Sequence, residues 1–207
     1  ISAGYGLWFL RESQSLNKAR YILGTSCNIS GTGFVFSNEI VKRMGGWKYY
    51  LLTEDLEFTA DNVIKGEKIG YCENAVLYDE QPTGMAQSVR QRTRWCKGYF
   101  QVLAAHGKEL ARGAFIDGNF SCYDMLMSMT PAFILSLAGV IANVIWMIAS
   151  IISGAGIAAV ALEALKGIFN GYLMFLVLGF ITTLTEWGRI ETSAAKKILY
   201  TFTFPLF

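Results

Sequence analysis

Two short groups of residues in this sequence carry side chains suited to chemistry. The first is the acidic triplet Thr53–Glu54–Asp55, and the second is the run Gln91–Arg92–Thr93–Arg94–Trp95. A carboxylate can take a proton from a hydroxyl within hydrogen-bond reach. Arginine matches phosphate oxygens with its planar fork of N–H groups, and a tryptophan face can stack on the apolar face of a sugar. These residue types fit the transfer of a sugar from a phosphate-bearing donor.

Each group has a simpler interpretation when it is taken alone. An acidic triplet is typical of the start of a helix, because the helix dipole favours negative charge there. A run with glutamine, arginine and tryptophan at helical spacing is typical of a surface helix. The two groups occur in this order, however, and just ahead of long uncharged stretches. That combination favours a chemical role for both.

Helices must bring these side chains together. The first group lies at the start of an expected helix over Leu56–Lys65. The second lies in an expected helix of about residues 83–106, which Thr83 can cap and Gly107 can end. One face of this second helix carries Gln91, Arg94, Trp95 and Gly98. The helix could lie along a membrane surface with that face toward a site; the alternative is an ordinary amphipathic helix packed on its own domain.

The remaining pattern predicts an α/β, water-facing segment over residues 1–118. Two further helices are expected at 8–23 and 39–44. The turn Gly31–Thr32–Gly33 should lead into a short buried strand that ends at Phe36. Two more short strands are expected at 69–72 and 75–78. The fold class that follows is an α/β domain with membrane helices after it.

Two stretches downstream lack charged side chains, at 125–162 and 167–185. A helix needs about 20 apolar residues to cross a bilayer. We therefore expect membrane spans at about 128–153 and 168–187, and the start of a third at residue 198, all within a transmembrane region of 119–207. Basic residues flank the pair of spans on their outer sides, which places residues 1–118 in the cytoplasm. The alternative is a set of buried helices in a large soluble protein.

Composition supports a membrane part and excludes some other functions. Hydrophobic residues make up 53% of the chain and charged residues 16%, against about 25% charged in a typical soluble domain. A net charge of +2 gives no support for nucleic-acid binding. The four cysteines are scattered and there is a single histidine, so we expect neither a zinc site nor a disulfide framework.

The motifs resemble those of a known family. Gly31–Thr32–Gly33, Thr53–Glu54–Asp55 and Gln91–Arg92–Thr93–Arg94–Trp95, with Lys97–Gly98 following, are similar to the C-terminal half of membrane-embedded family-2 glycosyltransferases. That group includes cellulose, chitin, hyaluronan and poly-N-acetylglucosamine synthases. The resemblance implies the C-terminal half of a GT-A-type α/β domain followed by transmembrane helices.

The resemblance also implies a role for each matching residue. Asp55 matches the catalytic base that deprotonates the acceptor hydroxyl, and Thr53 and Glu54 match neighbours that shape the acceptor end of the site. Trp95 matches the platform for the acceptor sugar. Residues that match the donor or acceptor contacts, or the loop behind the acceptor pocket, are Gln91, Arg92, Arg94, Gly31, Thr32 and Gly33.

One feature of the family is missing from this chain. Members hold Mg²⁺ or Mn²⁺ with an Asp-x-Asp motif, and this sequence has no such motif. No metal ligand is therefore expected here, and the resemblance implies that the metal and nucleotide sites belong to an N-terminal half. We expect the 207-residue chain alone not to turn over a nucleotide sugar.

The implied activity is transfer of a hexose or N-acetylhexosamine from a UDP-sugar, with inversion, to a glycan acceptor at the cytoplasmic membrane face, as in polysaccharide synthesis. Two alternatives stay open. One is transfer of a single sugar to a lipid or lipid phosphate, and the other is a non-catalytic membrane scaffold. A small transporter fits poorly, because neither apolar stretch has an ionisable residue at its centre.

Overall fold

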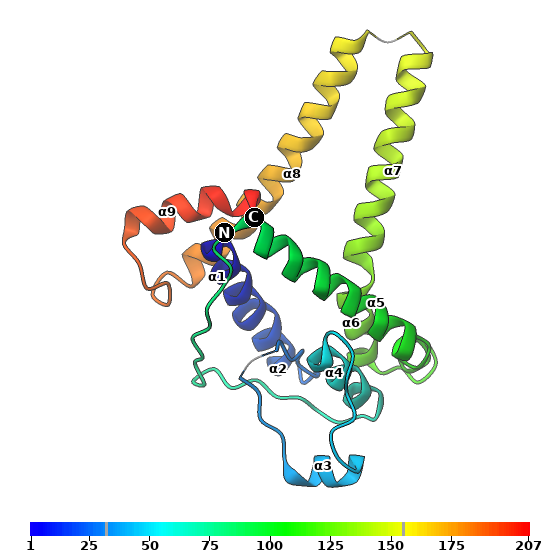
Figure 1. Ribbon diagram of the computed structural model, residues 1–207, viewed down its shortest axis with the longest axis vertical. Helices are drawn as coiled ribbons and strands as arrows, with labels where there is room; N and C mark the ends of the chain where they lie inside the picture. The colour runs from blue at the N-terminus through cyan, green and yellow to red at the C-terminus, as the bar shows by residue number, and fades with distance from the viewer. Residues whose placement is uncertain (32, 155) are drawn as a thin grey trace. The chain divides into compact units, whose positions relative to one another are not determined.

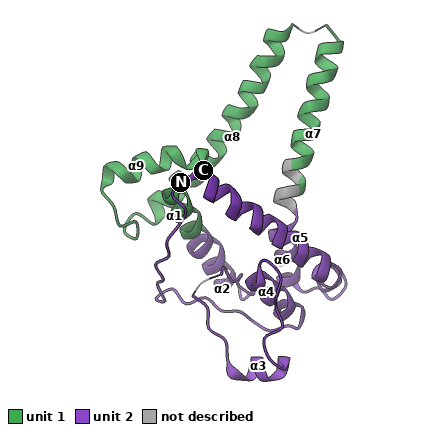
Figure 2. Cartoon of the chain, viewed as in Figure 1, with its two compact units in different colours: residues 1–11, 132–207 green, residues 12–131 purple. Residues whose placement is uncertain are grey.

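The computed structural model describes residues 1–31, 33–154 and 156–207, and its regular elements are helices (Figure 1). They are α1 (Ser2–Leu10), the π-helix η1 (Arg11–Asn17), α2 (Lys18–Ile22), α3 (Asn38–Met44), α4 (Glu54–Ile64), α5 (Met85–Phe115), α6 (Phe120–Met129), α7 (Pro131–Ile152), α8 (Ile157–Thr185), α9 (Ala194–Thr203) and the 3-10 helix η2 (Phe204–Leu206). The chain divides into two compact units, one of residues 12–131 and one of residues 1–11 with 132–207 (Figure 2).

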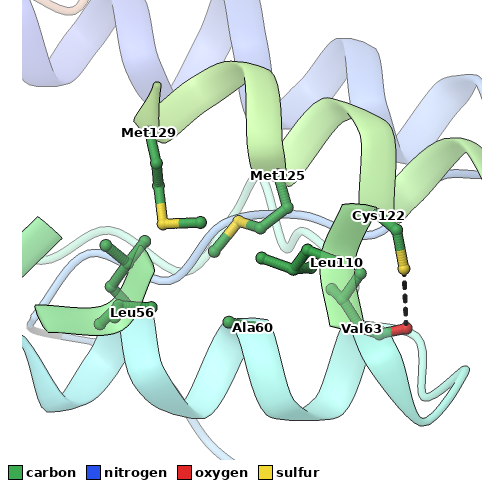
Figure 3. Close-up of a cluster of buried hydrophobic side chains, with 8 residues drawn as sticks. Leu56, Ala60, Val63, Leu110, Cys122, Met125 and Met129 are labelled. Carbon is green, nitrogen blue, oxygen red and sulfur yellow. Dashed lines mark hydrogen bonds between the residues drawn. The ribbon is translucent and has the colours of Figure 1, made fainter. Parts of the chain in front are cut away.

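The core of the 12–131 unit lies among α4, α5 and α6. Figure 3 shows side chains of α4 facing those of α5 and α6, and the buried set is Leu56, Ala60, Val63, Val102, Leu110, Cys122, Met125 and Met129. A Cβ on Gly113 would lie 2.6 Å from the sulfur of Cys122. The absence of a side chain at Gly113 therefore lets α5 and α6 approach closely. The shared buried cluster holds both helices against α4.

A second, aromatic cluster fixes the segment that leads into α4. Trp47 stacks on Phe58 of α4 with ring centroids 5.6 Å apart, and Tyr49 meets the same ring edge-on at 5.3 Å. The Tyr49 hydroxyl donates to the carboxylate of Asp61. The carboxylate of Glu57 accepts from the N–H groups of Tyr50 and Leu51, each at 3.1 Å. The chain thus reaches Thr53 already tied to α4.

The expected α/β fold, the C-terminal half of a GT-A domain, is wrong for the described residues, none of which lies in a strand. Strands were expected after Gly33 and over 69–72 and 75–78, and these segments lie outside the helices. An apolar run becomes a strand when its backbone pairs with a neighbour. Here the Cys27 N–H donates to the Ile69 carbonyl at 2.9 Å, which is one rung rather than a ladder, and Val35 is 99% exposed.

The helix predictions agree better, except at the two ends of the long helix. Thr83 was expected to cap it, but α5 begins at Met85 after Gly84, without a side-chain cap. Residues 39–44 and 56–65 are helical within a residue or two, and Gly45 ends α3 in the left-handed conformation. The long helix was expected to stop at Gly107, but α5 continues to Phe115. Burial of Leu110 against α6 outweighs the cost of about 1 kcal/mol for a glycine inside a helix.

The unit of residues 1–11 and 132–207 packs α1, α8, α9 and η2 together. The hydroxyls of Thr183 on α8 and Thr201 on α9 are 2.7 Å apart in a buried contact. The ammonium group of Lys197 donates to the Trp187 carbonyl at 2.5 Å and lies 4.6 Å from the centre of the Trp187 ring. These polar contacts hold α9 against the end of α8.

In the described part of the chain one helix is long and apolar enough to cross a membrane. It is α8, with 29 residues and a mean hydropathy of 1.7 in its most apolar stretch. The expected first span, about 128–153, includes residues 131–133, 135 and 136, whose side chains lie outside the described part, and its described apolar stretch, Leu137–Ile152, is shorter. The expected third span begins in α9, which is amphipathic and ten residues long. With one candidate span among the described residues, the multi-pass topology is not supported.

The predicted domain boundary at residue 118 stays a prediction. In the structure α6 follows that point and packs with α4 and α5.

Candidate functional site

The carboxylate of Asp55 lies in the first turn of α4 and is held by backbone N–H groups. One oxygen accepts from the N–H of Gly31 at 2.5 Å, and the other accepts from the N–H of Leu56 at 2.8 Å. Gly31 has a φ of +52°, in the left-handed region that side-chain-bearing residues rarely adopt. The glycine turn and the acidic triplet, far apart in sequence, therefore meet as one structure. Thr32 lies outside the described residues.

A buried threonine fixes the same turn a second time. The hydroxyl of Thr59 donates to the Asp55 carbonyl at 2.8 Å and accepts from the N–H of Ile29 at 3.2 Å. Ile29 and Gly31, two residues apart in the sequence, thus both donate their N–H groups to side chains of α4. The Asp55 side chain is half-buried, and Glu54 beside it is exposed. This arrangement orients Asp55 while leaving it accessible.

The segment before α4 also contacts α5. Nη1 of Arg94 donates to the Leu52 carbonyl at 3.0 Å, and the Leu52 N–H donates to the side-chain oxygen of Gln101 at 3.2 Å. Thr53 packs directly on Gly98, where an added Cβ would lie 2.4 Å from the Thr53 methyl carbon. The acidic triplet and the cationic helix are joined through these contacts.

Arg94 is exposed and borders two hollows beside α5. One, of about 450 Å³, is lined by Glu80, Pro82, Gln87, Arg90, Gln91 and Arg94. The other, of about 300 Å³, is lined by Leu52, Val89, Arg90, Thr93, Arg94 and Lys97. Both are lined by Arg90 as well as Arg94, so two arginine residues border each hollow. Such a surface attracts phosphate oxygens.

The remaining predicted residues take different positions on α5. Gln91 borders the larger hollow together with Arg94. Trp95 and Arg92 are half-buried and make contacts of their own within the protein. Thr93 turns its hydroxyl back to the Val89 carbonyl at 2.8 Å. The structure thus joins Gly31 directly to Asp55, links Arg94 to the Asp55 segment through Leu52, and carries Gln91 and Trp95 on the same helix as Arg94.

Several residues of this site were missed from the sequence. Leu52 and Gln101 contribute a backbone anchor and a side-chain acceptor. Arg90, whose charge next to the site face is readable from the sequence, lines both hollows. The seven-residue spacing from Arg94 to Gln101, which places both on one helix face, is the signal that could have identified Gln101.

Tyr99 on α5 lies close enough to the Asp55 carboxylate for its pKa to be affected. Partial burial, with the nearby carboxylates of Glu12 and Asp55, raises the pKa of Tyr99 to about 12. Its phenol therefore stays protonated at physiological pH and can act as a hydrogen-bond donor.

The described residues do not fit a resident metal ion. No group of three or more His, Cys, Asp or Glu side chains lies close enough together among them to hold one. Asp55 and Glu57 have the right sequence spacing, but their oxygens accept from backbone N–H groups of different segments. No chemical step is assigned to a metal in this part of the chain.

Comparison with known proteins gives a consistent result. The model of the family "Glycosyl transferase family group 2" matches residues 7–185. A probable glycosyltransferase of Bacillus subtilis, YdaM, is 27% identical over 120 residues, which cover 58% of this chain and 28% of that protein. A probable glycosyltransferase of Sulfolobus acidocaldarius is 32% identical over 74 residues, 35% of this chain and 16% of that protein.

The chain spans less than a third of either of these relatives. No solved structure matches it significantly.

Proposed function

The chain belongs to glycosyl transferase family group 2, and on this premise we propose that the protein containing it transfers a sugar from a UDP-sugar to a glycan acceptor at the cytoplasmic face of a membrane, with inversion. The observation that carries the proposal is the position of Asp55. Two backbone N–H groups orient its carboxylate, and the Leu52–Thr53 segment ties it to Arg94.

Asp55 is the proposed general base. A carboxylate has about four lone-pair sites, and the Asp55 carboxylate uses one on each oxygen for the N–H groups of Gly31 and Leu56. A further lone pair takes the proton of the acceptor hydroxyl as its oxygen attacks the anomeric carbon. The bond from that carbon to the diphosphate oxygen breaks on the opposite face, which inverts the anomeric centre.

Arg94 and Arg90 are the proposed partners of the departing diphosphate. Both arginine residues line each hollow, and Gln91 lines the larger one. Charge-assisted hydrogen bonds that strengthen as the diphosphate leaves lower the barrier for the transfer. The expected Mg²⁺ or Mn²⁺ would add charge to the same diphosphate, with ligands outside the described residues.

Trp95 is the proposed platform for the acceptor sugar. Its indole can stack on the apolar face of a sugar ring and exclude water from it. Thr53 and Glu54 lie at the same end of α4 as Asp55, and Gly31, which donates to Asp55, lies in the turn behind it.

Membrane attachment is proposed through α8. The helix has the length and composition of a span, and an interfacial position suits Trp187 just beyond its end. A glycan made at the cytoplasmic face would then start beside the membrane that it must cross.

A second candidate is transfer of one sugar to a lipid phosphate. The smaller hollow favours it, because the apolar side chains of Leu52 and Val89 lie beside the cations Arg90, Arg94 and Lys97. A lipid phosphate would place its phosphate against these cations and its hydrocarbon part against the apolar side chains.

The test uses the natural full-length protein in membranes with radiolabelled UDP-hexoses and UDP-N-acetylhexosamines. We expect release of UDP and label in a long polymer. Label in a lipid extract with one added sugar supports the second candidate. No UDP release with any donor, from a folded protein, contradicts both and leaves the scaffold alternative.

A further inference from the structure

Three residues on one face of α5 contact the segment that precedes Asp55. They are Arg94, Gly98 and Gln101, at spacings of four and three residues. Two turns of helix separate Arg94 from Gln101, about 10 Å along the axis, yet both side chains reach the backbone of Leu52. Arg94 donates to its carbonyl and Gln101 accepts from its N–H. Both polar groups of this backbone residue are therefore satisfied by α5.

Other polar contacts of this segment are made with α4 and not with α5. The N–H groups of Tyr50 and Leu51 are taken by Glu57, which is itself on α4. The side chain of Thr53 makes no capping hydrogen bond at the start of α4. Leu52 is 38% exposed, so burial of its side chain holds it only in part. The polar contacts at Leu52 and the packing of Thr53 on Gly98 therefore add to the burial of Leu56 in attaching this end of α4 to α5.

We propose that Gln101 is a positioning residue for sugar transfer, acting through Leu52 to set Asp55 relative to Arg94. This inference rests on the proposed function. Arg94 has two tasks in that arrangement, because one of its N–H groups holds Leu52 while the residue also lines both hollows. Gln101 has the anchoring task alone. Its replacement therefore separates positioning of the base from binding of the diphosphate.

The variant pair that tests this is Gln101→Leu and Gln101→Glu in the natural full-length protein. Leucine has a similar size and no acceptor, whereas glutamate keeps an accepting oxygen at the same reach. A shift of about 1 Å in a catalytic group can cost about 100-fold in rate. We expect Gln101→Leu to lower kcat 10- to 100-fold and Gln101→Glu to keep it within about threefold of wild type.

The KM for the donor and the affinity for UDP separate positioning from binding. Both should stay within about twofold of wild type in Gln101→Leu, because Arg94 and Arg90 are retained. Glu109→Leu, an exposed polar-to-leucine change on the same helix, is the matched control and should leave kcat unchanged. Hydrogen exchange of the peptide containing Leu52 should become faster in Gln101→Leu alone.

Three results overturn the inference. A wild-type kcat in Gln101→Leu removes the positioning role while the proposed function stands. Equal losses of kcat in the leucine and glutamate variants, with equal losses of Tm, assign Gln101 a structural role. A wild-type protein that turns over no donor overturns the inference together with the proposed function, and the wild-type assay identifies that case.

Discussion

At the scale of single residues, the sequence shows which side chains could act but not what holds them. The types and spacing of Asp55 and Arg94 are readable, and so is the glycine turn at Gly31. The contact from Gln101 to Leu52 joins residues 49 positions apart. The seven-residue spacing places Gln101 on the same helix face as Arg94, but no pattern in the sequence indicates which distant backbone N–H it meets. Positioning contacts of this kind therefore need the structure.

Asp61 gives a prediction at this scale that concerns stability. Burial by itself would raise the pKa of Asp61, but hydrogen bonds from Lys65, Tyr49 and Lys48 outweigh it and hold the pKa below its ordinary value. The stabilisation is then fully present above the ordinary pKa of about 3.9 and is lost as pH falls through the lowered folded value. The Tm of the wild type should fall across that acidic range.

Asp61→Asn tests this directly. Hydrogen bonds to a charged group contribute about 1.5–3 kcal/mol, so the variant should have a lower Tm at pH 7. Its Tm should also fall less than that of the wild type when the pH is lowered from 5 toward 3. Parallel Tm curves for the two proteins over that range would show that Asp61 is not the group responsible.

At the scale of elements, strong helical periodicity gave correct predictions and short apolar runs did not. Whether residues 69–72 form a strand depends on a partner backbone, which no local pattern encodes. The predicted end of α5 at Gly107 was wrong for a related reason, because the packing of Leu110 extends the helix beyond that glycine. Local signals predict elements well where the element satisfies its own hydrogen bonds.

Gly98→Ala tests the packing of α5 on the start of α4. In an exposed helix this change gains about 1 kcal/mol, but here the new Cβ would lie 2.4–2.9 Å from three side-chain atoms of Thr53. Overpacking of this kind costs about 1–3 kcal/mol. The clash should therefore win, lowering both Tm and kcat.

Gly84→Ala is the control for Gly98→Ala, because nothing lies within 4 Å of its added Cβ. A stabilised Gly98→Ala protein with wild-type kcat would show that Thr53 does not need its close approach to α5.

At the scale of the whole molecule, the chain consists of two compact units with different candidate roles. The 12–131 unit carries the candidate site on α4 and α5. The other unit contains α8, the candidate membrane span. The sequence predicted a membrane part after the site, and the described residues give one candidate helix where two spans were expected. Hydropathy alone finds apolar helices, but their number and length depend on where each helix ends.

Val177→Arg tests whether α8 enters the bilayer. Val177 is exposed on the helix and lies near the middle of the predicted span at 168–187. Arginine at a span centre costs about 2.5–3.5 kcal/mol of insertion free energy. The variant should be extracted from membranes by alkaline carbonate to a greater extent than Val177→Leu. Equal extraction of the two variants, or a wild type that needs no detergent, would contradict a membrane role for α8.

The central claim is that Asp55 is the base for sugar transfer, and one measurement tests it most directly. The rate of UDP release and the affinity for UDP are compared in the natural full-length wild-type protein and in Asp55→Asn. Asparagine keeps the size of the side chain and an acceptor for Gly31 but cannot take a proton. We expect a loss of kcat of about 100- to 10,000-fold, the usual contribution of a general base, and an unchanged affinity for UDP. Asp55→Asn turnover within tenfold of wild type would contradict the claim.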